Sequence, residues 1–266
     1  MRRLLWLAAF VAGIFAHFAF AASTTNLSDQ WWNKGESGWG ASVLQQNDTL
    51  FIDIFVYGQD TKSTWYTGAA VYQGTTAQGH LIFSGDLIAT TGPYYGMPAF
   101  DPNAVTRQKV GTITMDVDSI DTATLTYSVN GVVVVKSVTR QFWKMENVAG
   151  SYYGGLVYSA SGCVPASLNG PITELAALTV TQAGSAITIF ESATNGATCT
   201  YNGTYSQAGH MGTIQGTYSC SNTVHGSFTA FELEGNISGF TGRFTANNQY
   251  CSTVQGRLGG LRSTPY

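Results

Sequence analysis

The sequence predicts an all-β protein that consists of two consecutive small antiparallel meander β-barrels. Nearly every segment after residue 36 alternates with period two or is rich in β-branched and aromatic residues. Turn signals separate these segments, and the clearest is Asn130-Gly131, which is typical of a two-residue hairpin. No segment shows a sustained helical period with capping residues.

The expected strands fall into two groups. The first group lies at 38–46, 49–57, 63–72, 79–89, 109–117, 121–129 and 132–142. The second group lies at 150–158, 174–182, 185–192, 198–205, 212–220, 225–234, 238–246 and 250–259. We expect one domain at 22–145 and another at 146–266. Seven or eight sequential strands in about 120 residues suit a barrel of lipocalin or avidin size, with an immunoglobulin-like sandwich as the alternative.

The N-terminal segment has the pattern of an export signal. Arg2 and Arg3 precede an apolar run that ends in Ala19-Phe20-Ala21, which predicts a signal peptide at residues 1–21. The alternative is a membrane anchor, but His17 interrupts a run already shorter than the about 20 apolar residues that a spanning helix needs. We expect export to the periplasm or the cell surface, with no transmembrane span after signal removal.

The low charge of the chain excludes several classes of protein. Charged residues make up 10% of the sequence and the formal net charge is −3, whereas an average soluble domain has about 25% charged residues. This composition excludes a charge-rich disordered chain and a long coiled coil. It also provides no basic surface, so nucleic acid is not an expected partner.

Four cysteines, all in the second half of the chain, predict two disulfides in an oxidising compartment. If Cys199 lies opposite Cys220 in an antiparallel hairpin, Tyr201 falls opposite Tyr218 in the same register. Opposed Cα atoms in such a ladder are about 4.5–5.5 Å apart, within the range that a disulfide tolerates.

The remaining cysteines are Cys163 and Cys251. Cys163 follows the first strand of the second group, and Cys251 lies at the start of its last strand. The end of the first strand lies beside the start of the last in an even-stranded barrel. We therefore expect this second disulfide to hold the barrel closed.

Two stretches carry a resemblance to known proteins. The stretch Trp31-Trp32-Asn33-Lys34-Gly35-Glu36-Ser37-Gly38-Trp39-Gly40, with Gln45-Gln46 and Thr64-Trp65-Tyr66 after it, resembles a domain that recurs in exported proteins of Gram-negative bacteria. The tail Gly239-Phe240-Thr241-Gly242-Arg243-Phe244, continuing to Gly256-Arg257-Leu258-Gly259-Gly260, resembles a partner domain often found after it. This resemblance to an exported, β-rich two-domain family covers most of the chain beyond the signal. It implies export and β structure, and it supplies no catalytic residues.

The sequence offers little catalytic chemistry. Gly35-Glu36-Ser37-Gly38 is similar to the segment around a chymotrypsin-like nucleophile, but no histidine lies between the predicted signal and Ser37 to serve as the base. The histidines His80, His210 and His225 have no partner at metal-ligand spacing. We therefore expect no enzyme activity, no catalytic residue, no bound metal and no cofactor.

For two segments, the sequence pattern does not decide which strand face points into the barrel. Asp53 shares a face with Phe51 and Phe55, so it points either into an apolar interior or into solvent. The hairpin at Asn130-Gly131 has one apolar face and one face of Thr and Ser hydroxyls. We expect the apolar face to form the core. The alternative is a hydroxyl-lined lumen that binds a polar ligand.

Aromatic side chains give the main functional indication. Tyr94 and Tyr95 lie in a connection from Thr91 to Gln108, and connections of this length are often binding loops. Exposed rings with few charges suit stacking on sugars or contact with an apolar partner. The alternative is that the rings cap a barrel or lie buried between the domains. The expected ligand-binding residues are Trp31, Trp32, Trp39, Asp53, Trp65, Tyr94 and Tyr95.

From these observations we expect an exported, non-catalytic binding protein. Its expected ligand is a glycan or a small amphipathic molecule. The alternative is a structural or adhesive protein of the cell surface whose aromatic surface contacts another protein.

Overall fold

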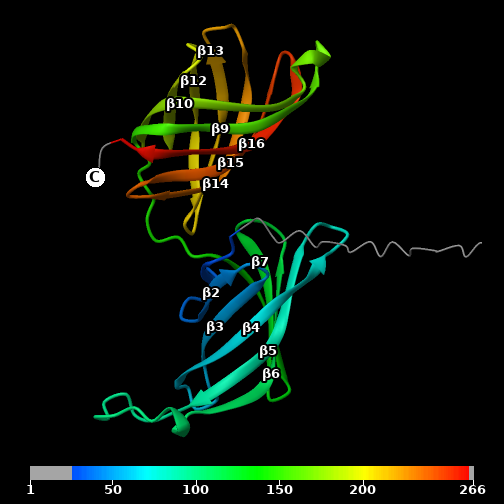
Figure 1. The fold of residues 1–266 in the computed structure, drawn as a ribbon. Helices are drawn as coiled ribbons and strands as arrows, with labels where there is room; N and C mark the ends of the chain where they lie inside the picture. Colours follow the sequence, from blue (N-terminus) through cyan, green and yellow to red (C-terminus); the bar gives the residue numbers. More distant parts are fainter. Residues whose placement is uncertain (1–25, 264–266) are drawn as a thin grey trace, which may run out of the picture.

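The computed structural model describes residues 26–263, which form two closed barrels, one after the other in the chain (Figure 1). Each barrel has eight antiparallel strands, each paired with its neighbours in sequence, and the last strand pairs with the first. This arrangement confirms the predicted all-β class and the two meander barrels. Closure of both sheets excludes the sandwich alternative. The predicted signal peptide at residues 1–21 lies outside the described residues.

The first barrel begins with a strand that the sequence analysis missed. Its strands are β1 (Asp29–Trp32), β2 (Gly40–Gln46), β3 (Thr49–Tyr57), β4 (Ser63–Thr75), β5 (Leu81–Thr91), β6 (Thr106–Val117), β7 (Thr122–Val129) and β8 (Val132–Arg140). Because β1 has only four residues, it has no clear alternation to predict it. It nevertheless closes the barrel, since Trp31 pairs with Ala41 of β2 and with Arg140 of β8.

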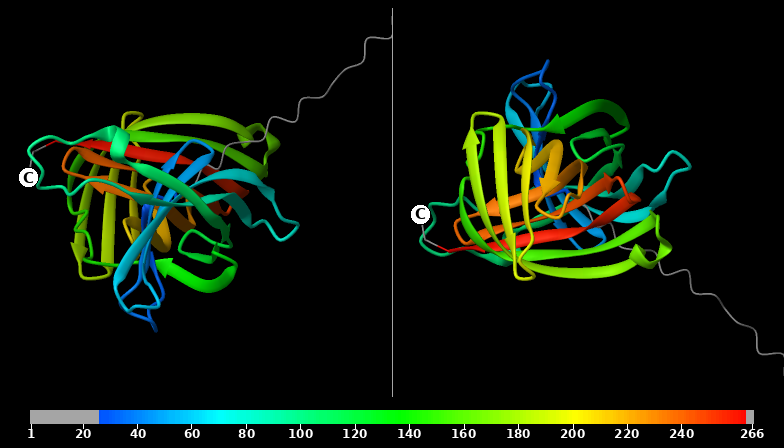
Figure 2. Two further views of the ribbon diagram at one scale, coloured as in Figure 1. Left: turned by 90° about the horizontal axis from the view of Figure 1, so that it is seen from below. Right: turned by 90° about the horizontal axis from the view of Figure 1, so that it is seen from above.

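The second barrel contains the longer strands. They are β9 (Gly150–Cys163), β10 (Gly170–Ala183), β11 (Ala186–Ala193), β12 (Thr198–Ala208), β13 (Met211–Cys220), β14 (His225–Asn236), β15 (Gly239–Asn248) and β16 (Cys251–Arg262). The predicted domain boundary after residue 145 falls in the connection between β8 and β9. Seen from above in Figure 2, the sheet of this barrel curves round until β16 lies beside β9.

Both predicted disulfides are present in the second barrel. Cys199 on β12 pairs with Cys220 on β13, and the predicted register holds, with Tyr201 opposite Tyr218. Cys163 at the end of β9 pairs with Cys251 at the start of β16. This second bridge therefore joins the two strands that close the barrel, as expected.

The hairpin of β7 and β8 shows which face of the first barrel is the interior. Ala123, Leu125 and Val138 are buried in the core, while the Ser137 and Thr139 side chains are exposed. This confirms that the apolar face is the core, and it excludes the hydroxyl-lined lumen. Val132, beside the turn, is exposed because it lies at the end of the barrel.

A polar cluster joins the two barrels. Asp29 at the start of β1 accepts hydrogen bonds from Arg140, at 3.1 Å, and from the ring of His210, at 2.8 Å. His210 lies in the turn between β12 and β13, so this carboxylate links the barrels. Asn26 adds a hydrogen bond to Glu234 on β14.

Helical structure in the described chain is limited to two single 3₁₀ turns, Pro102–Ala104 and Ala166–Leu168. Within residues 26–263, no helix has the length and apolar character needed to cross a membrane.

Candidate functional site: a cavity inside the second barrel

The second barrel encloses a cavity of about 470 Å³. Every strand from β9 to β16 contributes inward-facing side chains to its wall. Most of these side chains are apolar, among them Leu178, Ile187, Ile214, Phe228, Phe244 and Val254. A cavity of this size lies in the range of small-molecule binding sites, about 300–1,000 Å³, and eight-stranded barrels are wide enough to hold one small ligand.

Small side chains at inward positions are part of the wall of this space. Ala160, Ala230 and Ala246, on three different strands, all line the cavity. In the first barrel the corresponding interior is filled by large side chains such as Phe83 and Met115, which are completely buried. Barrel closure fixes the diameter of the interior, so the inward side-chain volume decides how much space is left.

The cavity opens at the end that carries the two disulfides. Among its lining residues, exposed side chains such as Leu168, Asn222 and Tyr250 belong to the connections at this end. The opposite end faces the connection from the first barrel. There Val148 lines the cavity, and its carbonyl accepts a hydrogen bond from the Tyr152 hydroxyl.

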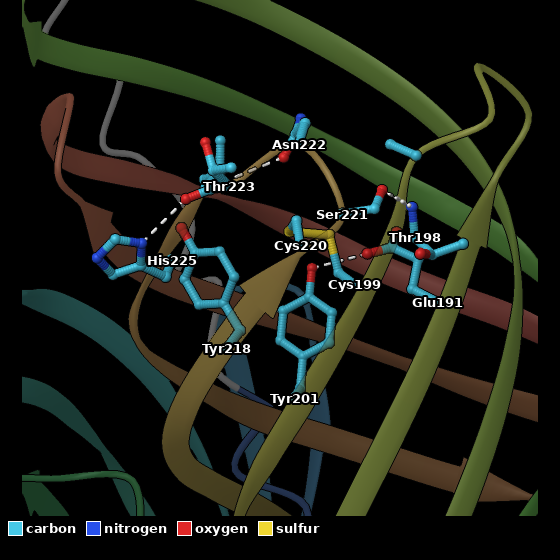
Figure 3. The surroundings of a disulfide bond; sticks show 12 residues. Glu191, Thr198, Cys199, Tyr201, Tyr218, Cys220, Ser221, Asn222, Thr223 and His225 are labelled. Carbon is cyan, nitrogen blue, oxygen red and sulfur yellow. Dashed lines mark hydrogen bonds between the residues drawn. A yellow bond between two sulfur atoms is a disulfide. The ribbon is translucent and has the colours of Figure 1, made fainter.

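One carboxylate lies within the apolar wall. Glu191 on β11 is only 2% exposed, and it pairs in register with Cys199 on the neighbouring strand β12. Its Oε2 accepts a hydrogen bond of 2.7 Å from the Tyr201 hydroxyl (Figure 3). Its Oε1 is fully buried and has no hydrogen-bond partner among the residues that the structure describes. Such an atom is an unsatisfied buried hydrogen-bond acceptor, and a donor that reached it would stabilise it.

Burial changes the acidity of the groups in the cavity wall. It raises the pKa of Glu191, although the hydrogen bond from Tyr201 partly opposes this shift. Burial also raises the pKa of Tyr201 and, with the charges of Glu174 and Glu191, raises that of Tyr158 to about 12. The phenols therefore stay neutral, and Glu191 holds a proton more tightly than a carboxyl in water.

The polar groups of the cavity wall are two carboxyls, phenolic and threonine hydroxyls and side-chain amides in otherwise apolar surroundings. No group of three or more His, Cys, Asp or Glu residues within 26–263 is arranged to hold a metal ion.

The seven residues predicted from the sequence to bind a ligand all lie in the first barrel and its loops, away from the cavity wall. Trp31 is 1% exposed, and its indole donates a hydrogen bond of 3.0 Å to the carbonyl of Leu27. The guanidinium of Arg140 lies over the same ring, 4.9 Å from its centroid. Trp31 is therefore part of the core, because β1 turns its side chain inward.

Asp53 and Trp65 lie on the same outer face of the first barrel, although Asp53 pairs in register with Thr67 and not with Trp65. Asp53 on β3 is half-buried and shares its face with Phe51 and Phe55. Trp65 on β4 pairs in register with Phe55, and its side chain is 50% exposed. Of the two orientations open for Asp53, the structure shows the outward one. Burial by the surrounding side chains raises the pKa of this carboxyl.

The other predicted aromatic residues gather at the end of the first barrel away from β12 and β13. Trp32 and Trp39 flank the turn between β1 and β2, and both are half-buried. The Trp39 indole donates to the Glu36 carboxylate, which also pairs with Lys136. Tyr94 and Tyr95 are exposed in the connection between β5 and β6, with ring centroids 4.6 Å apart.

The sequence analysis missed Glu191, Tyr201 and Tyr158 as site residues. The sequence did contain a signal for Glu191, since this residue lies on the same strand face as Ile187 and Ile189. Burying a carboxylate on an apolar strand face reduces the stability of the fold unless the carboxylate has a hydrogen-bond or charge partner. The hairpin register of the disulfide likewise placed Tyr201 and Tyr218 on one face.

Comparison of the chain with protein-family models, with curated proteins and with solved structures found no match in any of the three. The resemblance to an exported two-domain family therefore stays a prediction.

Proposed function

We propose that the protein is an exported binding protein that takes up one small amphipathic molecule in the cavity of its second barrel. The observation that supports this most strongly is a mostly apolar cavity of about 470 Å³ whose wall contains a buried carboxylate oxygen with no hydrogen-bond partner within residues 26–263. Apolar pockets with a few placed polar groups are typical of small-molecule sites. The polar group would orient the ligand, and the apolar wall would supply most of the binding free energy.

The cavity favours an amphipathic ligand over a glycan. A sugar has hydroxyls around its whole ring, and each one buried without a hydrogen bond reduces affinity. The cavity wall is mostly apolar, and many of its polar side chains, such as Glu174, Asn195 and Asn222, lie toward the mouth. The exported location is supported by the signal-like N-terminal sequence and by the two disulfides.

Titration with Nile red, an uncharged apolar dye whose fluorescence rises in apolar surroundings, tests this function. We expect saturable binding of one dye molecule to the wild-type protein. The variant Ala246→Phe would fill the cavity and reduce affinity by about tenfold or more, since each 1.4 kcal/mol of lost binding free energy is a factor of ten. Ala246 lines the cavity next to Phe228.

The matched control is Ala177→Phe. Ala177 is exposed on the outer face of β10, beside Tyr153, so this variant adds the same side chain outside the cavity. Dye binding equal to that of the wild type is expected. If both variants reduced binding equally, or if the wild type did not bind the dye, the cavity would not be the binding site.

A second candidate function is contact with another protein through the first barrel. The outer face of β2, β3 and β4 carries a row of exposed apolar side chains: Leu44, Phe51, Phe55, Tyr57, Trp65 and Val71. A contiguous exposed apolar surface is typical of a protein interface. A second copy of this chain is the partner that can be tested directly.

Sedimentation analysis of the wild type and of the variant Phe55→Ser with Trp65→Ser tests this second function. If the face binds a second copy, we expect the wild type to self-associate and the variant to remain monomeric. A wild-type monomer at all concentrations would remove self-association from consideration.

A further inference from the structure

The polar part of the cavity has a negative character with no facing cation. Glu191 and Glu174 both line it, and none of its lining residues within the described chain is Lys, Arg or His. Glu174, on β10, is half-buried and accepts a hydrogen bond of 3.3 Å from Asn195 near the mouth. Glu191 lies deeper and is almost completely buried. A buried carboxylate is stabilised when an opposite charge or a hydrogen-bond donor is brought to it.

Only one of the two Glu191 oxygens has a donor from the protein. Oε2 accepts from Tyr201, whereas Oε1 is buried without a partner among residues 26–263. Carboxylates accept hydrogen bonds through both oxygens, and those from charged N–H groups are the strongest. A ligand that brings a positively charged N–H donor to Oε1 would therefore complete the hydrogen bonding and balance the charge.

A cluster of aromatic rings begins at Tyr201, the tyrosine that donates to this carboxylate. Tyr201 stacks on Tyr218 with ring centroids 5.3 Å apart and an interplanar angle of 20°. Phe228 meets Tyr201 edge-on, also at 5.3 Å. All three rings line the cavity beside the Cys199–Cys220 disulfide (Figure 3 shows the two tyrosines). The faces of aromatic rings attract cations, most strongly where water is excluded.

We propose that the cavity binds an amphipathic amine, with its protonated amino group on Glu191 and its apolar body in the barrel. The inference rests on the proposed function and names its ligand class. Because Oε1 is fully buried, the Glu191 carboxyl turns to present this oxygen to the cavity. The ammonium group then donates to it and lies near the Tyr201 and Tyr218 rings. The hydrocarbon part extends past Ala230 toward Phe240, through the apolar part of the cavity. Glu174 at the mouth attracts the cation as it enters, but it contributes less because water screens it.

Competition against Nile red with three ligands of equal chain length tests the class. The ligands are decylamine, decanol and decanoate, which carry a cationic, a neutral and an anionic head. We expect decylamine to compete at least about 30-fold better than decanol. The reason is that a charge pair shielded from water raises the binding affinity by a factor of about 30 or more. Decanoate should compete worst, since its carboxylate would face two like charges. Equal competition by the amine and the alcohol, or better competition by the acid, would overturn the proposal.

The variant Glu191→Gln tests the residue. Glutamine has the same shape and still accepts from Tyr201, so the variant removes the charge; its own affinity for Nile red is measured first and is the reference for the competitors. Relative to decanol on the same variant, we expect the affinity for decylamine to fall by about 30-fold or more. The matched control Glu174→Gln removes the carboxylate near the mouth and should weaken decylamine by no more than about fivefold. Equal losses in both variants would contradict the place given to Glu191.

The failures of the two proposals can be told apart. Absence of Nile red binding to the wild type contradicts the proposed function itself. Nile red binding that the amine and the alcohol displace equally contradicts only the ligand class. If Glu191→Gln did not fold, the ranking of the three ligands on the wild-type protein would still decide the class.

Discussion

The first barrel is filled by its own side chains, whereas the second barrel encloses a cavity, although both have eight strands in the same meander order. Phe83, Leu87 and Ile113 of the first barrel have no exposed surface. The first barrel also has inward alanines, Ala41, Ala70 and Ala123, but large neighbours fill the space beside them, whereas the space beside Ala230 and Ala246 of the second barrel stays open. The comparison shows that strand number and topology set the frame of a barrel, while the volume of its inward side chains decides whether it can hold a ligand.

The two barrels also differ in how they are held together. All four cysteines lie in the second barrel, and both disulfides lie at the mouth of its cavity. A barrel whose interior is incompletely filled has fewer packing contacts. Cross-links that restrict the unfolded chain compensate for such a loss. The first barrel has no disulfide and is stabilised by dense packing.

The largest expected effect is the loss of a disulfide. Replacing Cys163 and Cys251 by Ser should destabilise the second barrel by about 4–5 kcal/mol, and replacing Cys199 and Cys220 by about 3 kcal/mol, because the first bridge closes a longer loop. Every tryptophan lies before residue 144, so tryptophan fluorescence during thermal unfolding reports the first barrel. That transition should not move, while the tyrosine circular dichroism of the second barrel should. A joint shift would show that the barrels unfold as one unit.

Enlarging an inward alanine in each barrel tests the difference in filling. Ala70 in the first barrel is completely buried beside Leu50. Ala70→Phe should therefore cost about 3 kcal/mol through overpacking. Ala246→Phe in the second barrel should cost less than about 1 kcal/mol, because the ring enters the cavity. Urea unfolding followed by the two spectroscopic signals measures both. Equal losses would indicate that the second barrel is as filled as the first.

Glu191 makes the stability of the second barrel depend on pH. Because burial raises its pKa in the folded state, the folded chain binds the proton more tightly than the unfolded chain. Stability from this group is present below the unfolded pKa and is lost as pH rises through the folded pKa. Glu191→Gln should remove this dependence, so the stability of the variant relative to the wild type should rise as pH rises through the folded pKa of Glu191. Parallel pH profiles of the two proteins would contradict the burial of the charge.

The smallest expected effect concerns the contact between the barrels. The hydrogen bond to Asp29 raises the pKa of His210. Burial opposes the ionisation of Asp29, but the hydrogen bonds from His210 and Arg140 outweigh it and lower its pKa. The His210 contribution is therefore present below its unfolded pKa and is lost as pH rises through the folded value.

Replacement of His210 by Gln measures this contribution. Because the His210 side chain is 34% exposed, we expect a loss of no more than about 0.5 kcal/mol at mildly acidic pH and almost none at alkaline pH. Thermal unfolding across this pH range is the measurement. An effect that grows with rising pH would have the wrong sign for this pair.

Most of the fold follows from local patterns in the sequence. Period-two alternation located nearly all strands, because each strand buries one face, and Asn130-Gly131 located a hairpin. The disulfides followed from matching Tyr201 with Tyr218 in one register. The short β1 escaped prediction, since four residues carry too little pattern, although it closes the first barrel.

The sequence by itself determined two consecutive β units, the strand order and the cysteine pairing in the second unit, because these depend on residues close in the chain or on a fixed alternation. The tertiary structure alone decided that Asp53 faces outward, that Trp31 belongs to a core and that a cavity surrounds Glu191. The physical reason is that a cavity is what remains after eight strands contribute their inward side chains. Its volume therefore depends on all of them together and on no single segment.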